Sequence, residues 1–406
     1  MNLGMILNAP YPPDMRVKKE TDALTRAGFK IHLLCLRKDG QPYEEEIDGI
    51  SIARIDAGKN NFQLALRDAM MSMTFQHPEF RKAIPGWVKK NNIKIIHVHD
   101  LPLGGTALAL RKNLGIKVVL DLHENYPEAL RTWFEWKKGF MVKLKNQIFM
   151  NPNRWTRHER HAVSESDYVI AVVDEMKNRI LQSYGVDTAK VIVISNTEEK
   201  SFLNQSVDPS IYKDLKSKFK ILYSGGIGPH RGVDTAIEGM QYLKTYNDIE
   251  LVIIGSGSAD VMHHLNEVAR KCKVETHVHF LGYQPFQRFY SYMHLADVNI
   301  IPHKSNAHTD NTVPHKLFQS MMSGRPVLVS SSDPLKRLVN STHSGLVFEA
   351  NNPEDFATKI LALYKNKSLA HELGENGLKA TAQGDLNWDH EQNNLIQFYR
   401  KLFSSL

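Results

Sequence analysis

The sequence predicts an α/β protein of two domains, each built on a parallel β-sheet, and three observations support this. The chain has 406 residues, which is more than one hydrophobic core usually contains. Short apolar runs alternate with segments of helical periodicity, as in βαβ units. A polar stretch, TEEKSFLNQSVDPSIYKDLKSK, interrupts this alternation and is interpreted as a linker. We therefore expect an N-terminal domain at 1–198 and a second domain at 199–385.

The composition is that of a globular protein with an excess of basic residues. Apolar residues make up 42% and charged residues 23%, and the net charge of +7 favours anionic partners without saying of which kind. Cys35 and Cys272 lie far apart and provide neither a disulfide framework nor a metal-binding spacing, so a cytoplasmic setting is expected. We expect neither a signal peptide nor a transmembrane helix.

The first domain is expected to open with a βαβ unit. Its parts are a strand at 3–7, a helix at 17–27 and a strand at 29–36. Asp14 and Arg16 lie in the first loop, at the carboxyl end of a strand, where ligands bind in open α/β sheets. Arg16 is therefore a candidate binding residue, and the alternative is an ordinary surface cation.

Two later strands of this domain end in histidine followed by a carboxylate. The strand at 93–98 leads into His99, and the strand at 117–122 leads into His123. Titratable groups then lie at the same edge of one sheet. A core histidine is the alternative for each. We accept it for His99 and treat His123, whose strand is more apolar and whose loop is more polar, as a candidate functional residue.

Residues 131–160 combine aromatic and basic side chains with few acids. The residues concerned are Arg131, Trp133, Phe134, Trp136, Lys137, Lys138, Phe140, Lys143, Lys145, Phe149, Arg154, Trp155, Arg157 and Arg160. This pattern suggests a surface for anionic lipid headgroups, although single-stranded nucleic acid is also compatible with it. The alternative is a helical hairpin whose aromatic side chains pack into the first domain.

The second domain is expected to begin with a strand at 220–223, the glycine-rich loop SGGIGPHRG and a helix at about 233–243. The glycines allow the backbone to approach a ligand, and Arg231 lies at the helix entry. The loop is not a dinucleotide fingerprint, because the spacing to Gly232 is one residue too long. The later strands also end in small or polar turns, at 251–254, 278–281 and 298–301, so a crevice along that edge is predicted.

The stretch from Val313 to Ser331 predicts a helix, a tight turn and a buried strand at 327–329. The helix is expected from about Pro314 to Ser323, with Asn311 or Thr312 as its cap. Its N-terminus suits a phosphate. Lys316 and Gln319 share one face of the helix, where a cation and an amide fit a diphosphate and a sugar hydroxyl. The alternative is an ordinary solvated helix face.

In their order and spacing, these segments resemble the retaining glycosyltransferases of family four, group-1 type. The resemblance rests on PPDMRVKKETDALTRAGFKIHLLC, IIHVHD, VLDLHENYPE, VIVISN, ILYSGGIGPHRGVDTAIEGM, LVIIGSGS, HFLGYQPF and VPHKLFQSMMSGRPVL. It implies the GT-B architecture, in which two Rossmann-like domains face each other across a cleft. It also implies no metal, a nucleotide-sugar held mainly on the second domain, and a last helix, about 386–406, that crosses back to the first domain.

The resemblance further implies roles for individual residues. Arg231 and Lys316 would bind the diphosphate and compensate the charge of the leaving group, and His123 would approach the donor sugar. Gln319 and Asn311 replace the acids that usually meet the ribose hydroxyls and the donor sugar, and Gly226 replaces a common arginine. The donor-binding residues expected in all are Arg16, Gly225, Gly226, Gly228, Tyr283, Asn311, Thr312, Val313 and Gln319.

The expected function is transfer of a sugar from a nucleotide-diphosphate sugar to a glycan or lipid-linked acceptor in cell-surface polysaccharide synthesis. The resemblance implies a hexosyltransferase-type, retaining and metal-independent reaction without a cofactor, because the nucleotide-sugar is a substrate. We expect no nucleic acid partner, and attachment of 131–160 to an anionic membrane would place the protein at the inner face of the cell membrane.

Two other functions remain open. The neutral pair Asn311 and Gln319 favours a nucleotide-sugar-binding scaffold with impaired catalysis. A sugar-nucleotide 2-epimerase would call for acids and histidines in the crevice, where the sequence offers several histidines but no convincing acid beyond Asp310.

Overall fold

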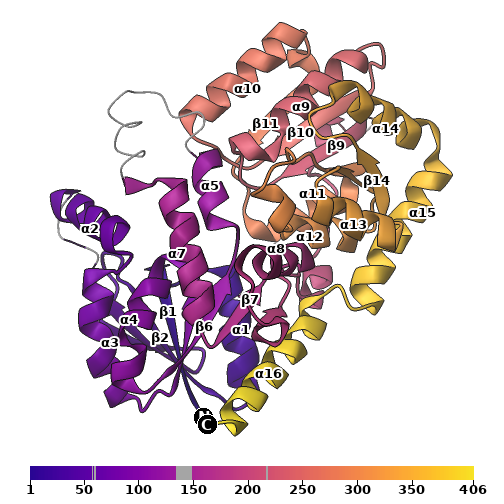
Figure 1. Ribbon diagram of the computed structural model, residues 1–406. Helices are drawn as coiled ribbons and strands as arrows, with labels where there is room; N and C mark the ends of the chain where they lie inside the picture. The colour runs from indigo at the N-terminus through magenta and orange to yellow at the C-terminus, as the bar shows by residue number, and fades with distance from the viewer. Residues whose placement is uncertain (57, 59–60, 134–148, 216–217) are drawn as a thin grey trace. The chain divides into compact units, whose positions relative to one another are not determined.

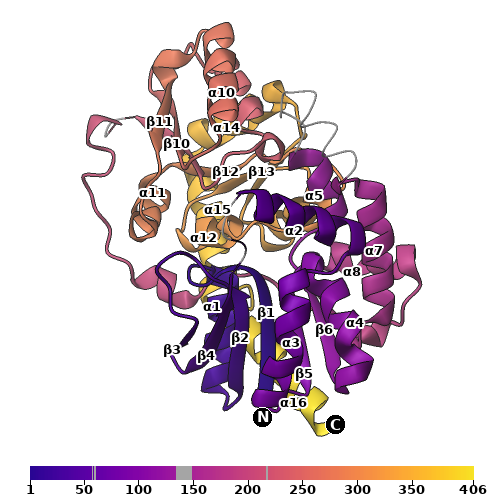
Figure 2. The ribbon, with the colours of Figure 1, turned by 90° about the vertical axis from the view of Figure 1, so that its left-hand side faces the viewer.

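The structure is a computed structural model that describes residues 1–56, 58, 61–133, 149–215 and 218–406 (Figures 1 and 2). The chain forms two compact units. Unit 1 is built from Met1–Arg131, residues 149–195 and Glu391–Leu406. Unit 2 is Asn196–His390, joined by Thr132 and Trp133.

Unit 1 contains an eight-stranded sheet in the order β3-β4-β2-β1-β5-β6-β7-β8. The strands are β1 Asn2–Pro10, β2 Lys30–Leu36, β3 Glu44–Ile47, β4 Ile50–Ile55, β5 Ile95–His99, β6 Lys117–Leu122, β7 Tyr168–Ala171 and β8 Val191–Val193. All pairs are parallel except β3 with β4. The central strands are nearly continuous apolar runs because helices cover both faces of a parallel sheet. The predicted parallel sheet of the first domain is confirmed, and the β3–β4 edge was not predicted.

The helices of unit 1 connect these strands. They are α1 Met15–Arg26, α2 Asn61–Thr74, α3 Pro78–Lys90, α4 Gly104–Leu114, α5 Tyr126–Trp133, α7 Pro152–Glu165, α8 Asp174–Tyr184 and α16 Trp388–Ser404. Most of the last helix, α16, belongs to unit 1 (Figure 1), and aromatic side chains join it to that unit. Tyr399 lies edge-on to Phe29 with ring centroids 6.3 Å apart, and Phe398 lies edge-on to Tyr168 at 5.3 Å.

Unit 2 contains a six-stranded parallel sheet in the order β11-β10-β9-β12-β13-β14. The strands are β9 Phe219–Ser224, β10 Ile249–Ile254, β11 Val278–Gly282, β12 Val298–Ile301, β13 Val327–Ser330 and β14 Gly345–Phe348. The helices are α9 Val233–Gly239, α10 Ala259–Cys272, α11 Phe289–Leu295, α12 Lys316–Met322, α13 Asp333–Thr342, α14 Pro353–Lys365 and α15 Lys367–Leu378.

Alternate residues of the unit 2 strands pack on opposite faces of the sheet. Ile221 and Leu251 belong to the core shared with α9, α10 and α14. Leu222 and Val252 belong to a second cluster that contains side chains of α11 and α12. Coverage of both faces and parallel pairing make unit 2 a doubly wound α/β domain, as predicted.

Candidate functional site

The turn after β9 is held close to the end of β10 by glycine. Gly255 has a φ of +133°, and a Cβ placed on it would lie 1.9 Å from the carbonyl oxygen of Gly225. Only glycine fits there, so the two strand ends lie in direct contact. The backbone of Gly226 is exposed, and the space beside its Cα is open. The turn therefore leaves room for a ligand at the carboxyl end of β9.

Lys316 reaches this turn from α12. Its Nζ donates a hydrogen bond of 2.9 Å to the carbonyl oxygen of Ser224 and lies 3.6 Å from the centre of the Tyr223 ring. Burial, together with the positive charge of Arg231, lowers the pKa of Lys316 well below its usual value. An anion bound at this amine would stabilise its charged form and so raise the pKa of Lys316.

Arg231 is brought to the same place by close packing of two loops. A Cβ on the next residue, Gly232, would lie 1.7 Å from the carbonyl oxygen of Pro302, so the turn packs directly on the loop that follows β12. Nη1 of Arg231 lies 3.1 Å from Nε2 of His303. Because a guanidinium only donates, this contact requires neutral His303 with Nε2 as the acceptor.

Neutral histidines surround these two cations. The ring centre of His230 lies 6.3 Å from that of His303 and 5.2 Å from that of His308. Burial and the charge of Arg231 lower the pKa of His230 to about 3 and that of His308 to about 4. Within the described residues, neither Arg231 nor Lys316 forms an ion pair with a carboxylate. Two basic side chains at a strand end, without an ion-pairing carboxylate among the described residues, can bind a diphosphate.

Helix α12 differs from the prediction. It begins at Lys316 rather than Pro314, ends at Met322, and has no side-chain cap. The expected cap Asn311 instead donates from Nδ2 to the carbonyl oxygen of Ala307 at 2.8 Å. His315, just before the helix, lies with Nε2 3.1 Å from the carbonyl oxygen of Thr197. The helix N-terminus stays a predicted phosphate contact, and the structure places the side chain of Lys316 at the turn after β9.

The remaining expected donor-side residues lie in different environments. Asn311 is buried, and Thr312 and Val313 follow it in the loop before α12. Tyr283 follows β11 and is 76% exposed, which leaves its ring free to stack on a ligand.

The structure adds an acid that the sequence did not reveal. Gln319 is 4% exposed, which rules out the alternative of a solvated helix face, and its Nε2 donates to Oε2 of Glu198 at 2.7 Å. The two residues are 121 positions apart, and Glu198 lies at the start of a polar stretch that we interpreted as a linker. The signal in the sequence was a pair of adjacent glutamates, Glu198 and Glu199, a few residues after the last strand of unit 1.

In unit 1, Arg16 is a buried partner of two carboxylates. Its Nη2 lies 2.7 Å from Oδ1 of Asp121, and its Nε lies 3.0 Å from Oε1 of Glu20. Asp14 begins α1 by accepting a hydrogen bond from the backbone of Val17, which fixes Arg16 in the first turn. The alternative of a surface cation is therefore wrong. Its guanidinium is engaged within the protein.

His123 joins the same network from the loop after β6. Its Nε2 lies 2.9 Å from Oδ2 of Asp121, and its side chain is 24% exposed. Burial is the largest single influence on His123 and would lower its pKa, but the charge and hydrogen bond of Asp121 together with the charge of Asp100 raise the pKa above its usual value. Burial alone would raise the pKa of Asp121, whereas Arg16 and His123 hold it well below its usual value. His99 is fully buried, as expected.

Four residues of this network lie close enough together to be considered as metal ligands. Atoms of Glu20, His97, His99 and Asp121 all lie within 4.8 Å of one another. The guanidinium of Arg16, however, is paired with both carboxylates. A cation of the protein already balances these charges, so the residues do not fit a metal ion well.

In the described part of 131–160, some side chains are buried and others are exposed. Trp155 is buried and packs on Phe75 and Tyr126, with ring centroids 5.1 and 4.7 Å away, so for this residue the alternative of core packing is correct. Arg157 and Arg160 are exposed on α7. Phe134, Trp136, Lys137, Lys138, Phe140, Lys143 and Lys145 lie outside the described residues. Among the helices that are described, none has the length and apolar character to cross a bilayer.

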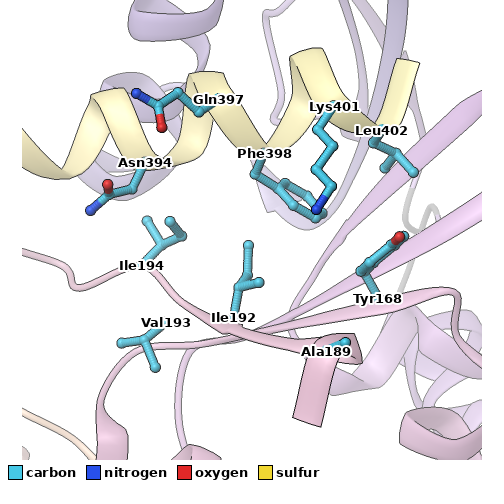
Figure 3. A pocket seen from close by; sticks show the side chains of 10 residues that line it. All are labelled: Tyr168, Ala189, Ile192, Val193, Ile194, Asn394, Gln397, Phe398, Lys401 and Leu402. Carbon is cyan, nitrogen blue, oxygen red and sulfur yellow. The ribbon is translucent and has the colours of Figure 1, made fainter. Parts of the chain in front are cut away.

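A cavity of about 390 Å³ in unit 1 lies away from all these residues (Figure 3). Figure 3 shows Ile192 and Ile194 on one side and Phe398 and Leu402 of α16 on the other. Lys401 is its one cation among the described lining residues. Its mostly apolar wall does not suit a diphosphate.

Two family comparisons match consecutive parts of the chain. The family described as Glycosyltransferase Family 4 matches residues 16–197, and that described as Glycosyl transferases group 1 matches residues 207–380. Together they cover most of both units. The chain belongs to the group 1 glycosyltransferases of family four, as the sequence motifs indicated.

Individual relatives are distant in sequence and similar in fold. An uncharacterized glycosyltransferase of Methanocaldococcus jannaschii is 25% identical over 291 residues, which is 71% of each chain. Sucrose-phosphate synthase from Thermosynechococcus elongatus has a TM-score of 0.80 at 16% identity and full coverage of both chains. Anabaena HepE in complex with UDP-glucose has a TM-score of 0.72 at 14% identity, also with full coverage. These likenesses identify the fold as GT-B.

Proposed function

We propose that the protein transfers a sugar from a nucleotide-diphosphate sugar and binds the diphosphate in unit 2. The observation that carries the proposal is the pair Arg231 and Lys316 at the carboxyl end of β9, without an ion-pairing carboxylate among the described residues. The complex of Anabaena HepE with UDP-glucose supports a donor of this class.

The chemistry follows from charge. As the bond between sugar and diphosphate breaks, negative charge grows on the leaving diphosphate. Arg231 and Lys316 stabilise that charge from fixed positions, because each is already held by His303 or by Ser224. The protein's own cations thus supply the charge compensation in a metal-independent reaction. Retention of the anomeric configuration is proposed on family membership alone.

For His123 we propose a role in the transfer step, with Asp121 and Arg16 as its supports. Asp121 holds Nε2 of His123 at 2.9 Å, so the ring is fixed in orientation. Arg16 balances the charge of Asp121, so we assign it to positioning rather than to direct donor contact. Tyr283, Asn311, Thr312, Val313 and the loop glycines remain proposed donor contacts.

A donor screen tests the proposed activity. The protein is incubated with UDP-sugars and GDP-sugars and with glycan and lipid-linked acceptors, and release of nucleotide diphosphate is measured. Arg231→Gln and Lys316→Met should each lower kcat/KM by about 100-fold, the loss typical for removing one group that stabilises transition-state charge. The matched control is Lys304→Met, because Lys304 is neutralised by Asp234 at 2.8 Å. Unchanged turnover in both site variants would contradict the proposal.

For the acceptor we propose a glycan or a lipid-linked glycan reached at an anionic membrane. Helix α2 exposes a stripe of apolar side chains at positions 66, 70 and 73: Leu66 is 51% exposed, Met70 46% and Met73 63%. Arg154 of α7 donates to the carbonyl oxygens of Ser72 and Met73 at the end of this helix. An apolar stripe beside cations is typical of helices that lie in a lipid interface.

Co-sedimentation with vesicles containing phosphatidylglycerol tests this attachment. The triple variant Leu66→Ser, Met70→Ser, Met73→Ser should lose most of its vesicle binding, because the inserted apolar area is removed. The control replaces Val207 and Leu281, which are exposed apolar residues of unit 2, by Ser. Equal sedimentation of the wild type and the α2 variant would exclude this surface.

A scaffold that binds nucleotide-sugar without turnover is the second candidate. The observation in its favour is that Asn311 and Gln319 are both uncharged and both hydrogen-bonded within the protein. Calorimetry that finds tight nucleotide-sugar binding, combined with no diphosphate release from any donor and acceptor, would favour the scaffold over the transferase.

A further inference from the structure

Glu198 is a buried acid that lies a few residues after the last strand of unit 1. Glu198 is 3% exposed and belongs to unit 2. Its carbonyl oxygen accepts a hydrogen bond from the backbone N–H of Trp388 at 2.8 Å. Its backbone is therefore held in place, and its side chain points to α12.

The carboxylate of Glu198 is fixed from two sides. Oε1 accepts from the backbone N–H of Glu199 at 2.8 Å, and Oε2 accepts from Nε2 of Gln319 at 2.7 Å. Nε2 of His315 lies 3.4 Å from Oε2. These contacts orient the carboxylate at the face of α12.

This contact decides which way the Gln319 amide points. A carboxylate only accepts hydrogen bonds, so the NH₂ group of Gln319 must face Glu198 and its Oε1 must face away. Within the described residues, Oε1 of Gln319 has no hydrogen-bond partner in the protein. Gln319 therefore presents an acceptor of fixed orientation, as a carboxylate would.

The position of Gln319 Oε1 on α12 indicates which ligand group it would bind. Gln319 lies three residues after Lys316 on α12, on the same helical face. Lys316 reaches the proposed diphosphate site through its contact with Ser224. In a nucleotide-diphosphate sugar, hydroxyl groups flank the diphosphate on both sides, and the ribose provides them on the nucleotide side.

We propose that Glu198 is a positioning residue that fixes the Gln319 amide as an acceptor for a ribose hydroxyl of the donor nucleotide. This inference rests on the proposed nucleotide-sugar function. In this proposal Gln319 contacts the ribose, and Glu198 contacts Gln319 rather than the ligand.

A charge-swap series tests the inference. In Glu198→Gln the new NH₂ group faces Gln319. The Gln319 amide then rotates so that its oxygen accepts from this NH₂ group and its own NH₂ group points to the ligand. Gln319→Glu places two carboxylates about 2.7 Å apart. In the double variant Glu198→Gln, Gln319→Glu, the amide and the carboxylate exchange places, and an acceptor faces the ligand again. Glu199→Gln is the matched control, because it removes the same charge one residue away.

Binding is measured by calorimetry with UDP and GDP and with their 2′-deoxy and 3′-deoxy forms. For whichever base the wild type prefers, we expect Glu198→Gln to weaken binding about 10-fold, the effect of one hydrogen bond to a fixed acceptor. At least one deoxy form should bind both proteins equally. The double variant should recover most of the loss, and Glu199→Gln should bind like the wild type.

The outcomes separate this inference from the proposed function. If the wild type binds neither nucleotide, the proposed function itself fails. If it binds UDP or GDP but Glu198→Gln keeps both the affinity and the preference for ribose, Glu198 does not position Gln319. A double variant no better than the single ones would give Glu198 a merely structural role, and would also overturn the inference.

Discussion

Lys316 combines a buried amine with a neighbouring guanidinium, and both lower its pKa. The groups that face it are the Tyr223 ring, the carbonyl oxygen of Ser224 and the charge of Arg231. His303, which Arg231 contacts, has a pKa well below its usual value for the same two reasons. The site is therefore less positive before binding than a count of its basic residues suggests.

This electrostatic state makes nucleotide diphosphate binding depend on pH. A bound diphosphate raises the pKa of Lys316, so the protein takes up protons on binding. Affinity should fall as the pH rises through the interval between the pKa of the free protein and that of the complex. Calorimetry with UDP and GDP in buffers of different ionisation enthalpy measures the uptake.

Lys316→Met should reduce this proton uptake because it removes the titrating amine. Lys304→Met, whose amine pairs with Asp234, should leave it unchanged. Binding with no proton uptake across the neutral and alkaline range would show that Lys316 is already charged in the free protein.

The sequence was informative about single residues where a local pattern identified them. Arg231 was predicted from its place after a glycine-rich loop, and Lys316 from the helix face that it shares with Gln319. The structure brings both to the end of β9. Glu198 was missed because its partner Gln319 lies 121 positions away. Arg16 was predicted as a binding residue, yet Asp121 and Glu20 engage its guanidinium.

At the scale of elements, apolar runs predicted the strands well because parallel strands are buried on both faces. Strands β3, β4 and β14 were missed. Strand β3 reads EEEI and has little apolar character. Helix α12 begins two residues later than Pro314 suggested. The expected cap Asn311 hydrogen-bonds to Ala307 within its own loop, and His315 lies against the carbonyl oxygen of Thr197.

Helix α16 was expected to cross back to the first domain, and a polar contact on its buried face tests how it is held. The hydroxyl of Tyr399 lies 2.6 Å from Nδ1 of His97, and both side chains are fully buried. Tyr399→Phe should lower the free energy of unfolding by about 1–3 kcal/mol, since it leaves a buried histidine nitrogen unpaired. Urea unfolding measures the loss.

Tyr168→Phe is the control for this variant. Its ring packs on Phe398 of the same helix, and within the described residues its hydroxyl forms no hydrogen bond. Its effect should stay within about 0.5 kcal/mol. Equal stabilities of the two variants would mean that the contact between Tyr399 and His97 contributes nothing measurable.

At the scale of the whole molecule, length and the single polar interruption predicted two α/β domains, and the chain has two such units. The units divide after Ser195 and after His390, close to the places where composition changes. A change in composition therefore indicates where one domain ends. It does not reveal that residues just beyond the boundary, such as Glu198, pack into the second unit.

The central claim is that unit 2 binds the diphosphate of a nucleotide-sugar through Arg231 and Lys316. A crystal structure of the protein soaked with UDP or GDP tests it most directly. We expect phosphate oxygens about 3 Å from the guanidinium of Arg231 and from Nζ of Lys316, beside the turn that follows β9. A nucleotide bound elsewhere, with both cations still in contact only with His303 and Ser224, would contradict the claim.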